Sequence, residues 1–319
     1  MMAAVTAAGE ECPAHPGLLV CIGDLVEDVV VWTDGPVLPA TDNPARIHRS
    51  RGGSAANVAV LGRALGRTRF IGRVGDDALG RALVAELERA GVEARVQVAG
   101  RTGTILVLVD DRGERTMFPD RAAAAELADV LPAEVAGAGV VHAPAYAFAT
   151  PHSATTTTAL LLAARAQGAL VSLDASSVDL LTRLGPAWTA DWLAGLRPDV
   201  LFANAAEAQV LGLGSGTGLP GTTVVVKHGA DPVQVTGPDG SVTSVPVDPV
   251  AVVRDTTGAG DAFAAGWLSA RLAGADTRTA VRAGSRLAAA VLARPGATAA
   301  PPPPRAPAAP APPDDRRAT

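Results

Sequence analysis

The chain has 319 residues, of which 48% are hydrophobic and 18% are charged, and its formal net charge is −5. This composition indicates a globular protein rather than a disordered one. No run approaches the ~20 uninterrupted apolar residues of a membrane span, and the acidic balance argues against nucleic-acid binding. Residues 1–17 lack a basic segment followed by an apolar one, so we expect no secretory signal and a cytoplasmic location. The two cysteines, Cys12 and Cys21, are then expected as reduced thiols.

The body alternates short apolar runs with segments of helical periodicity. The expected strands are 18–22, 69–71, 104–109, 139–142, 170–173, 200–203 and 223–226, and the expected helices are 55–65, 79–90, 155–166, 207–211, 261–273 and 277–293. Strands separated by helices predict an α/β fold whose mostly parallel sheet is covered on both faces. Such sheets bind ligands beyond the carboxyl ends of their strands.

Two pairs of expected strands have no helix between them. Residues 29–32 pair with 45–49, and residues 104–108 pair with 115–118 across a polar hairpin turn at 110–114. These pairs predict a small β-sheet that projects from the body. The first 17 residues and the proline-rich residues 299–319 are expected to be disordered tails, which leaves 18–298 as the folded domain.

A glycine-rich motif precedes the first expected helix. It reads Gly52-Gly53-Ser54-Ala55-Ala56-Asn57. Paired glycines would let a hydroxylated ligand lie against the backbone, and the asparagine amide can both donate and accept hydrogen bonds. From the residues alone, a helix-initiating turn with a solvated Asn57 explains the pattern equally well.

A second motif of small residues leads into an apolar helix near the C-terminus. It reads Asp255-Thr256-Thr257-Gly258-Ala259-Gly260-Asp261. The first N–H groups of a helix bind anions, so Gly258, Ala259 and Gly260 could form an anion hole for a phosphate. A carboxylate beside that site is explained if Asp261 takes a proton from a nucleophile that attacks the phosphate. The alternative is an ordinary turn in which the aspartate caps the helix.

A third polar pair follows the strand expected at 200–203. Asn204 and Glu207 are three residues apart, so both lie on the first turn of the next helix. Their oxygens suit Mg²⁺ held through water. A capping box, in which the two side chains bond each other's backbone, fits the same spacing.

The first two motifs, in this order and far apart, resemble the signatures of the ribokinase-like (PfkB-type) carbohydrate kinase family, and the resemblance covers roughly residues 18–297. It implies a three-layer sandwich with a mostly parallel central sheet and a small β-sheet lid formed by residues 29–51 and 103–119. It also implies an ATP-dependent phosphotransferase that acts on a hydroxyl of a sugar or nucleoside, with Asp261 as catalytic base and residues 258–260 as the anion hole.

The resemblance assigns further residues to each ligand. The acceptor site is expected at Asp28, Gly52, Gly53 and Asn57. The ATP site is expected at Asn204, Lys227, Gly229, Thr257, Gly258 and Gly260. Asn204 and Glu207 are expected to hold Mg²⁺ through water, and Asp255 and Gly296 are expected to bind a monovalent cation such as K⁺. A homodimer through the lid is also implied. Two residues depart from the family pattern. Val26 leaves open which pattern of hydroxyl groups the acceptor has, and Pro232 leaves open how the nucleotide base is contacted.

Two other functions are compatible with parts of the sequence. A non-catalytic sugar- or nucleoside-binding protein on the same fold would explain the departures at Val26 and Pro232, but it would be expected to lose its base, and Asp261 is present. A dinucleotide-dependent oxidoreductase requires Gly-x-Gly-x-x-Gly after the first strand, and Gly23-Asp24-Leu25 does not supply it. The sequence does not identify the substrate.

Overall fold

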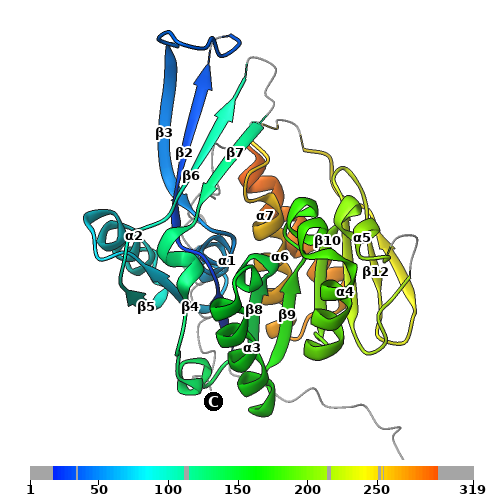
Figure 1. Ribbon diagram of the computed structural model, residues 1–319. Helices are drawn as coiled ribbons and strands as arrows, with labels where there is room; N and C mark the ends of the chain where they lie inside the picture. The colour runs from blue at the N-terminus through cyan, green and yellow to red at the C-terminus, as the bar shows by residue number, and fades with distance from the viewer. Residues whose placement is uncertain are drawn as a thin grey trace, which may run out of the picture.

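The computed structural model describes residues 17–33, 35–110, 115–213, 217–250, 253 and 255–293. A nine-stranded sheet forms the centre of the body in the order β13-β12-β11-β10-β9-β8-β1-β4-β5 (Figure 1). The pairs from β11 to β5 are parallel, and β12 and β13 extend the sheet as antiparallel strands. The strands are β1 (Leu18–Ile22), β4 (Arg67–Val74), β5 (Glu93–Val98), β8 (Val140–Pro144), β9 (Leu170–Asp174), β10 (Val200–Asn204), β11 (Thr223–His228), β12 (Asp231–Thr236) and β13 (Val242–Val245).

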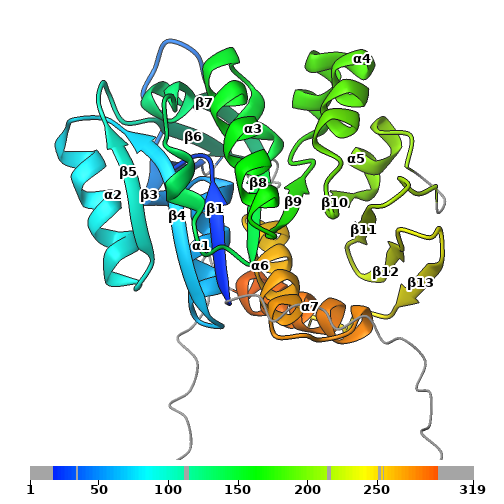
Figure 2. The same ribbon diagram turned by 90° about the horizontal axis from the view of Figure 1, so that it is seen from below.

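Helices cover both faces of this sheet, as Figure 2 shows from below. One face carries α3 (Pro151–Ala166), α4 (Val178–Leu196) and α5 (Ala205–Val210), and the other carries α1 (Ser54–Arg63), α2 (Ala78–Arg89), α6 (Ala259–Leu272) and α7 (Thr277–Leu292). Successive strand residues point to opposite faces, so β1 sends Val20 and Ile22 into the first layer and Leu19 and Cys21 into the second. The three layers expected from the strand and helix pattern are confirmed.

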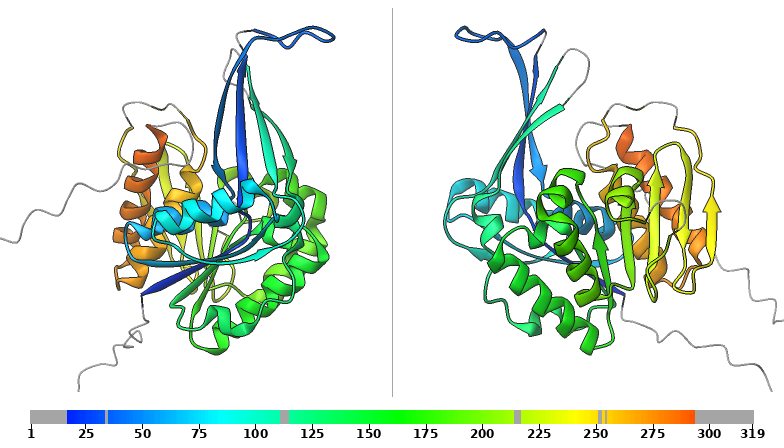
Figure 3. Two further views of the ribbon diagram at one scale, coloured as in Figure 1. Left: turned by 90° about the vertical axis from the view of Figure 1, so that its left-hand side faces the viewer. Right: turned by 45° about the vertical axis from the view of Figure 1, so that its right-hand side comes forward.

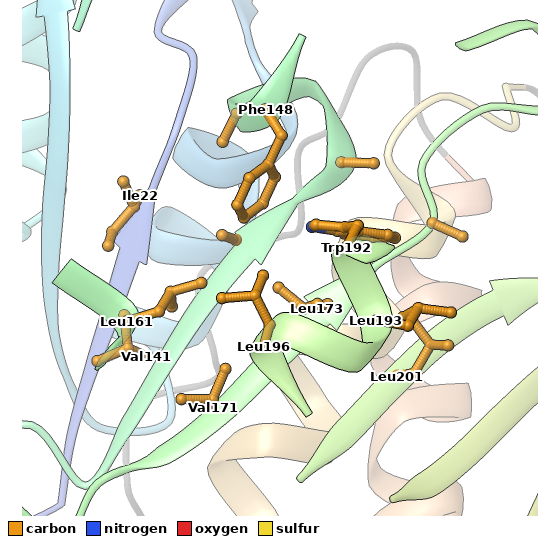
Figure 4. Close-up of a cluster of buried hydrophobic side chains, with 14 of the residues drawn as sticks. Ile22, Val141, Phe148, Leu161, Val171, Leu173, Trp192, Leu193, Leu196 and Leu201 are labelled. Carbon is orange, nitrogen blue, oxygen red and sulfur yellow. The ribbon is translucent and has the colours of Figure 1, made fainter. Parts of the chain in front are cut away.

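The layer between the sheet and α3 and α4 is built from large apolar side chains (Figure 4). Trp192 of α4 stacks on Trp188 with 5.3 Å between ring centroids, and it meets Phe148 edge-on at 5.5 Å. Aromatic pairs in these arrangements stabilise the layer beyond the burial of apolar area.

Cys21 of β1 is a free cysteine on the opposite face of the sheet, and its burial raises the pKa of the thiol.

A separate four-stranded sheet, the lid, projects from the body (Figure 3). Its order is β3-β2-β6-β7. These strands are β2 (Val26–Thr33), β3 (Ala45–Gly52), β6 (Thr104–Val109) and β7 (Arg115–Asp120). Both predicted strand pairs form: Val29 lies opposite Arg49, and Leu108 lies opposite Thr116.

Some expectations fall on residues that the structure does not describe. They are the two tails apart from Gly17, Cys12, positions 111–114 of the predicted hairpin turn, and Gly296. Among the helices in the described part of the chain, none is both long and apolar enough to cross a membrane.

Two neighbouring leucines of α3 test the packing of this layer. Leu161 is fully buried and Leu162 is 46% exposed. Leu161→Ala should lower the free energy of unfolding by about 2–5 kcal/mol, because it removes buried methyl groups and leaves a cavity. Leu162→Ala should change it by less than about 1 kcal/mol. Chemical denaturation of both variants measures the difference, and equal losses would contradict the described orientation of α3.

Candidate active site

A cavity of about 670 Å³ opens at one edge of the central sheet. Asp174 and Asn204, the last residues of β9 and β10, line it together with Lys227 of β11. The opposite wall includes the start of α6, from Gly258 to Asp261. The cavity therefore lies where parallel strands end, the edge at which sheets of this kind bind ligands.

Two residues of α1 hold the carboxylate of Asp261. The Ser54 hydroxyl donates to its Oδ1 at 2.6 Å, and the Asn57 amide donates to its Oδ2 at 2.8 Å. Burial raises the pKa of Asp261, and the two hydrogen bonds act in the opposite direction. The carboxylate is thus held in one orientation and can still accept further hydrogen bonds through its remaining lone pairs.

The start of α6 supports the predicted anion hole. Gly258 is the N-cap with φ of 75°, a left-handed conformation that favours glycine. The first intrahelical bond joins the Ala262 N–H to the Gly258 carbonyl at 2.8 Å. The N–H groups of Gly260 and Asp261 precede this bond and belong to the helix turn that attracts anions, whereas the Ala259 N–H donates to the Thr256 carbonyl at 3.3 Å.

A buried ion pair stands beside this helix start. The Lys227 ammonium donates to the Asp174 carboxylate at 3.1 Å. Burial lowers the pKa of Lys227, but the carboxylates of Asp174 and Glu207 more than offset this and raise it above the ordinary value. A Cβ atom added at Gly260 would lie 3.3 Å from the ammonium, so the positive charge sits directly against the predicted anion hole.

Asn204 and Glu207 form a reciprocal capping box at the start of α5. The Asn204 N–H donates to the Glu207 carboxylate at 2.8 Å, and the Glu207 N–H donates to the Asn204 side-chain oxygen at 2.9 Å. Both residues also line the cavity. Burial raises the pKa of Glu207, and the neighbouring Asp174 adds to this effect. The cap and a water-mediated metal contact are compatible, because the carboxylate has a second oxygen.

The predicted acceptor residues gather where the lid meets the body. The Asp28 carboxylate lies against the backbone of Gly52, where an added Cβ atom would come within 2.2 Å of the carboxylate oxygen. Gly53 has φ of 98°, and a Cβ atom there would collide with the Asp24 carbonyl at 2.2 Å. Glycine is therefore required at both positions, because a side chain would collide with these oxygen atoms. Burial raises the pKa of Asp28 to about 6, although the nearby Arg51 guanidinium opposes the shift.

The lid contacts the second motif through Arg115 of β7. Its guanidinium donates to the Asp255 carboxylate and to the Thr257 hydroxyl. Asp255 is 8% exposed, and its Oδ1 also accepts from the Thr257 N–H at 2.7 Å. A lid side chain is therefore bonded to the loop that precedes the predicted anion hole.

Comparisons with known proteins identify the family of the chain. The sequence profile described as pfkB family carbohydrate kinase matches residues 17–304. The chain belongs to the pfkB family of carbohydrate kinases. It is similar to an ATP-dependent ribose-1-phosphate kinase of Halopiger xanaduensis, with 35% identity over 83% of this chain and 88% of the relative. It is also similar to a fructokinase of Klebsiella pneumoniae, with 34% identity over 79% of this chain and 84% of the relative.

Solved structures of the family share the fold. The adenosine kinase of Sinorhizobium meliloti superposes with a TM-score of 0.77 at 23% identity, over 88% of this chain and 94% of that chain. A fructokinase of Xylella fastidiosa with bound ATP superposes with a TM-score of 0.72 at 24% identity, over 88% and 94% of the two chains. The ribokinase-like fold expected from the motifs is thereby confirmed.

The structure brings most of the predicted site residues together. Those that line the cavity are Asn204, Glu207, Lys227, Gly229, Gly258, Ala259, Gly260 and Asp261. Asn57 reaches the same place through Asp261, and Asp28, Gly52 and Gly53 lie next to it at the root of the lid. Thr257 and Asp255 contact the lid instead, and Gly296 lies outside the described residues.

Sequence reasoning missed several residues of the site. Asp174 could have been found, because it follows the strand expected at 170–173 directly. Ser54 lies inside the first glycine motif. Serine is so common at a helix start that the sequence does not indicate its bond to Asp261. Arg51 and Arg115 act across elements distant in sequence, and no local pattern marks them.

Proposed function

We propose that this protein is an ATP-dependent phosphotransferase that moves the γ-phosphoryl group of ATP to a hydroxyl of a sugar or nucleoside. The observation that carries the proposal is the Asp261 carboxylate, which two side chains of α1 hold at the start of α6 beside the cavity. The relatives named as kinases of ribose 1-phosphate and fructose support the same class of reaction.

In this reaction Asp261 accepts the proton of the attacking hydroxyl. The N–H groups of residues 258–260 and the ammonium of Lys227 stabilise the negative charge on the transferred group. Phosphoryl transfer needs little covalent work from a protein, so positioning and electrostatics account for most of the catalysis. Closure of the lid excludes water, which would otherwise compete as acceptor.

The acceptor is held at the root of the lid. The two oxygens of the Asp28 carboxylate can accept hydrogen bonds from neighbouring hydroxyl groups. Gly52 lets this carboxylate lie directly against the backbone, and Gly53 does the same for the Asp24 carbonyl. The names of the relatives define the first acceptors to assay: ribose 1-phosphate, fructose and adenosine. ATP enters from the side of Lys227, Gly229 and Asn204.

Mg²⁺ fits the residues on the nucleotide side. Glu207 and Asn204 offer one carboxylate and one amide at the cavity wall, a donor set that suits an ion retaining most of its waters. When bound with ATP, the ion would neutralise charge on the phosphates. Asp255, one of the residues expected for a monovalent cation, fits less well, because the guanidinium of Arg115 already places a positive charge beside it. We therefore assign no step to K⁺.

The Arg115 contact predicts how the reaction responds to monovalent cations. The wild-type rate should be the same in potassium chloride and choline chloride at equal ionic strength, because the guanidinium supplies the charge at Asp255. Arg115→Met should lower the rate and make it depend on K⁺. Arg101→Met is the control, since Arg101 lies before β6 and pairs with Asp120 at the end of β7. A several-fold activation of the wild type by K⁺ would contradict the assignment.

The roles of the two aspartates can be separated by kinetics. Asp261→Asn should lower kcat by about 10²–10⁴-fold with nearly unchanged ATP affinity, because it removes only the proton acceptor. Asp28→Ala should instead raise the KM for the acceptor, since each hydrogen bond to a charged group contributes about 1.5–3 kcal/mol. Release of ADP with varied acceptor and ATP measures both. Turnover of Asp261→Asn within a few-fold of wild type would remove this residue from the mechanism.

Glu207→Gln distinguishes a metal contact from a cap. If the carboxylate helps to hold Mg²⁺, the variant should need more Mg²⁺ for half-maximal rate. Loss of the capping box alone should lower stability by about 0.5–2 kcal/mol and leave the Mg²⁺ titration unchanged. A magnesium titration and a thermal melt on the same variant give both quantities, and an unchanged titration would assign Glu207 to the cap only.

A homodimer through the lid remains a proposal. The strand register places Ile47, Leu106 and Phe118 on one face of the lid, and they are 63%, 38% and 53% exposed. The double variant Ile47→Lys, Phe118→Lys should therefore shift sedimentation equilibrium toward the monomer. Met117→Lys, on the opposite face, is the control. A wild type that sediments as a monomer would contradict the dimer.

A further inference from the structure

Arg51, next to the first glycine motif, is a buried arginine in the site. It lies near the end of β3, and its side chain is 3% exposed. Its Nη1 donates to the Asn57 side-chain oxygen at 2.6 Å, and its Nε lies 3.3 Å from a carboxylate oxygen of Glu86 on α2. This contact between Nε and the Glu86 carboxylate is an ion pair, and its geometry is not that of a hydrogen bond. A guanidinium without access to water is stabilised only by such partners.

These contacts continue to the proton acceptor. Asn57 accepts from Arg51 through its oxygen and donates to Asp261 Oδ2 through its nitrogen at 2.8 Å. A guanidinium can only donate, so it fixes which end of the amide faces which neighbour. Glu86, Arg51, Asn57 and Asp261 therefore form one continuous chain from α2 to α6, which we call the Arg51 relay.

Resting on the proposed kinase reaction, we propose that Arg51 is a positioning residue: it orients Asn57 toward Asp261, and its charge balances the Asp28 and Asp261 carboxylates at the acceptor site. The relay extends the site to α2, which supplies the anchoring Glu86. Lysine could supply the charge but not the planar fork that reaches two partners at once.

The charges around Asp28 support this role. The pKa of Asp28 is raised to about 6, mainly by burial; the carboxylates of Asp261, Asp255 and Glu27 contribute to this rise, and Arg51 opposes it. On the nucleotide side, Asp261 also faces Asp174 and Lys227. Arg51 is thus the cation that opposes protonation of Asp28. Below about pH 6 the protonated form of Asp28 accumulates and binds hydroxyl donors less well, so acceptor binding should weaken as the pH falls.

A direct titration tests the charge independently of turnover. The carboxyl ¹³C signal of Asp28, assigned with Asp28→Asn, should titrate near 6 in the wild type. The midpoint of this titration should rise by about one pH unit or more in Arg51→Gln, because the substitution removes a nearby positive charge. Arg46→Gln is the matched control, since Arg46 lies at an exposed position of the same strand. An unchanged titration in Arg51→Gln, or an equal shift in Arg46→Gln, would overturn the proposal.

Kinetics test the orientation. Arg51→Lys keeps the charge and loses the fork, so kcat should fall by about tenfold while the acidic limb of the rate profile stays in place. Glu86→Gln, at a partly exposed position that should tolerate it, should also lower kcat without an upward shift of that limb. In both variants the KM for ATP should be unchanged. Wild-type kcat in both would overturn the relay.

If the proposed kinase reaction were wrong, the results would differ from those expected if only the role of Arg51 were wrong. A wild type that releases no ADP with any acceptor would refute the kinase assignment, whereas the Asp28 titration would still report on Arg51. If Arg51→Gln did not fold, Arg51→Lys and Glu86→Gln would decide the orientation, and a lowered melting temperature with unchanged kinetics in these two would reduce Arg51 to a structural role.

Discussion

The hydrogen bonds from Ser54 and Asn57 to Asp261 are the interaction on which the rest of the site depends. They join residues 207 and 204 positions apart in the chain, so the first glycine motif and the start of α6 meet at one carboxylate. The central sheet makes this meeting possible, because α1 and α6 pack on the same face of it. The fold thereby places the proposed acceptor site and the proposed anion hole within reach of one carboxylate.

The partly buried Asp261 carboxylate has to be balanced by positive charge. On the proposed nucleotide side the balance comes from Lys227, which is itself paired with Asp174. On the proposed acceptor side it comes from Arg51, which is paired with Glu86. Arg51 is buried and Lys227 is partly buried, and each has an acidic partner, so neither is left as an isolated charge. The lid adds a third cation, Arg115, which ties the lid to the loop before α6.

The parallel strands of the central sheet apart from β5, and both glycine motifs, could be predicted because their signals are local: apolar runs, turn residues and helix starts. Helix α4 was missed because Gly185, with φ of 85°, and the following Pro186 break its pattern at a kink. Strand β12 was missed because Pro232 argues against a strand, yet it lies beside the register shift between Val226 and His228, where the ladder is interrupted. The contact between Arg115 and Asp255 spans 140 positions. Contacts of this kind follow from tertiary packing, and no single segment of sequence encodes them.

Identification of the reaction product tests the central claim most directly. The wild-type protein would be incubated with ATP, Mg²⁺ and each acceptor of the panel, and the products would be identified by mass spectrometry and nuclear magnetic resonance. The proposed phosphotransferase should add a phosphoryl group to a hydroxyl of one acceptor and form ADP in equal amount. Tight binding of a sugar or nucleoside without any phosphorylated product would contradict it, and would favour a non-catalytic binding protein on the same fold.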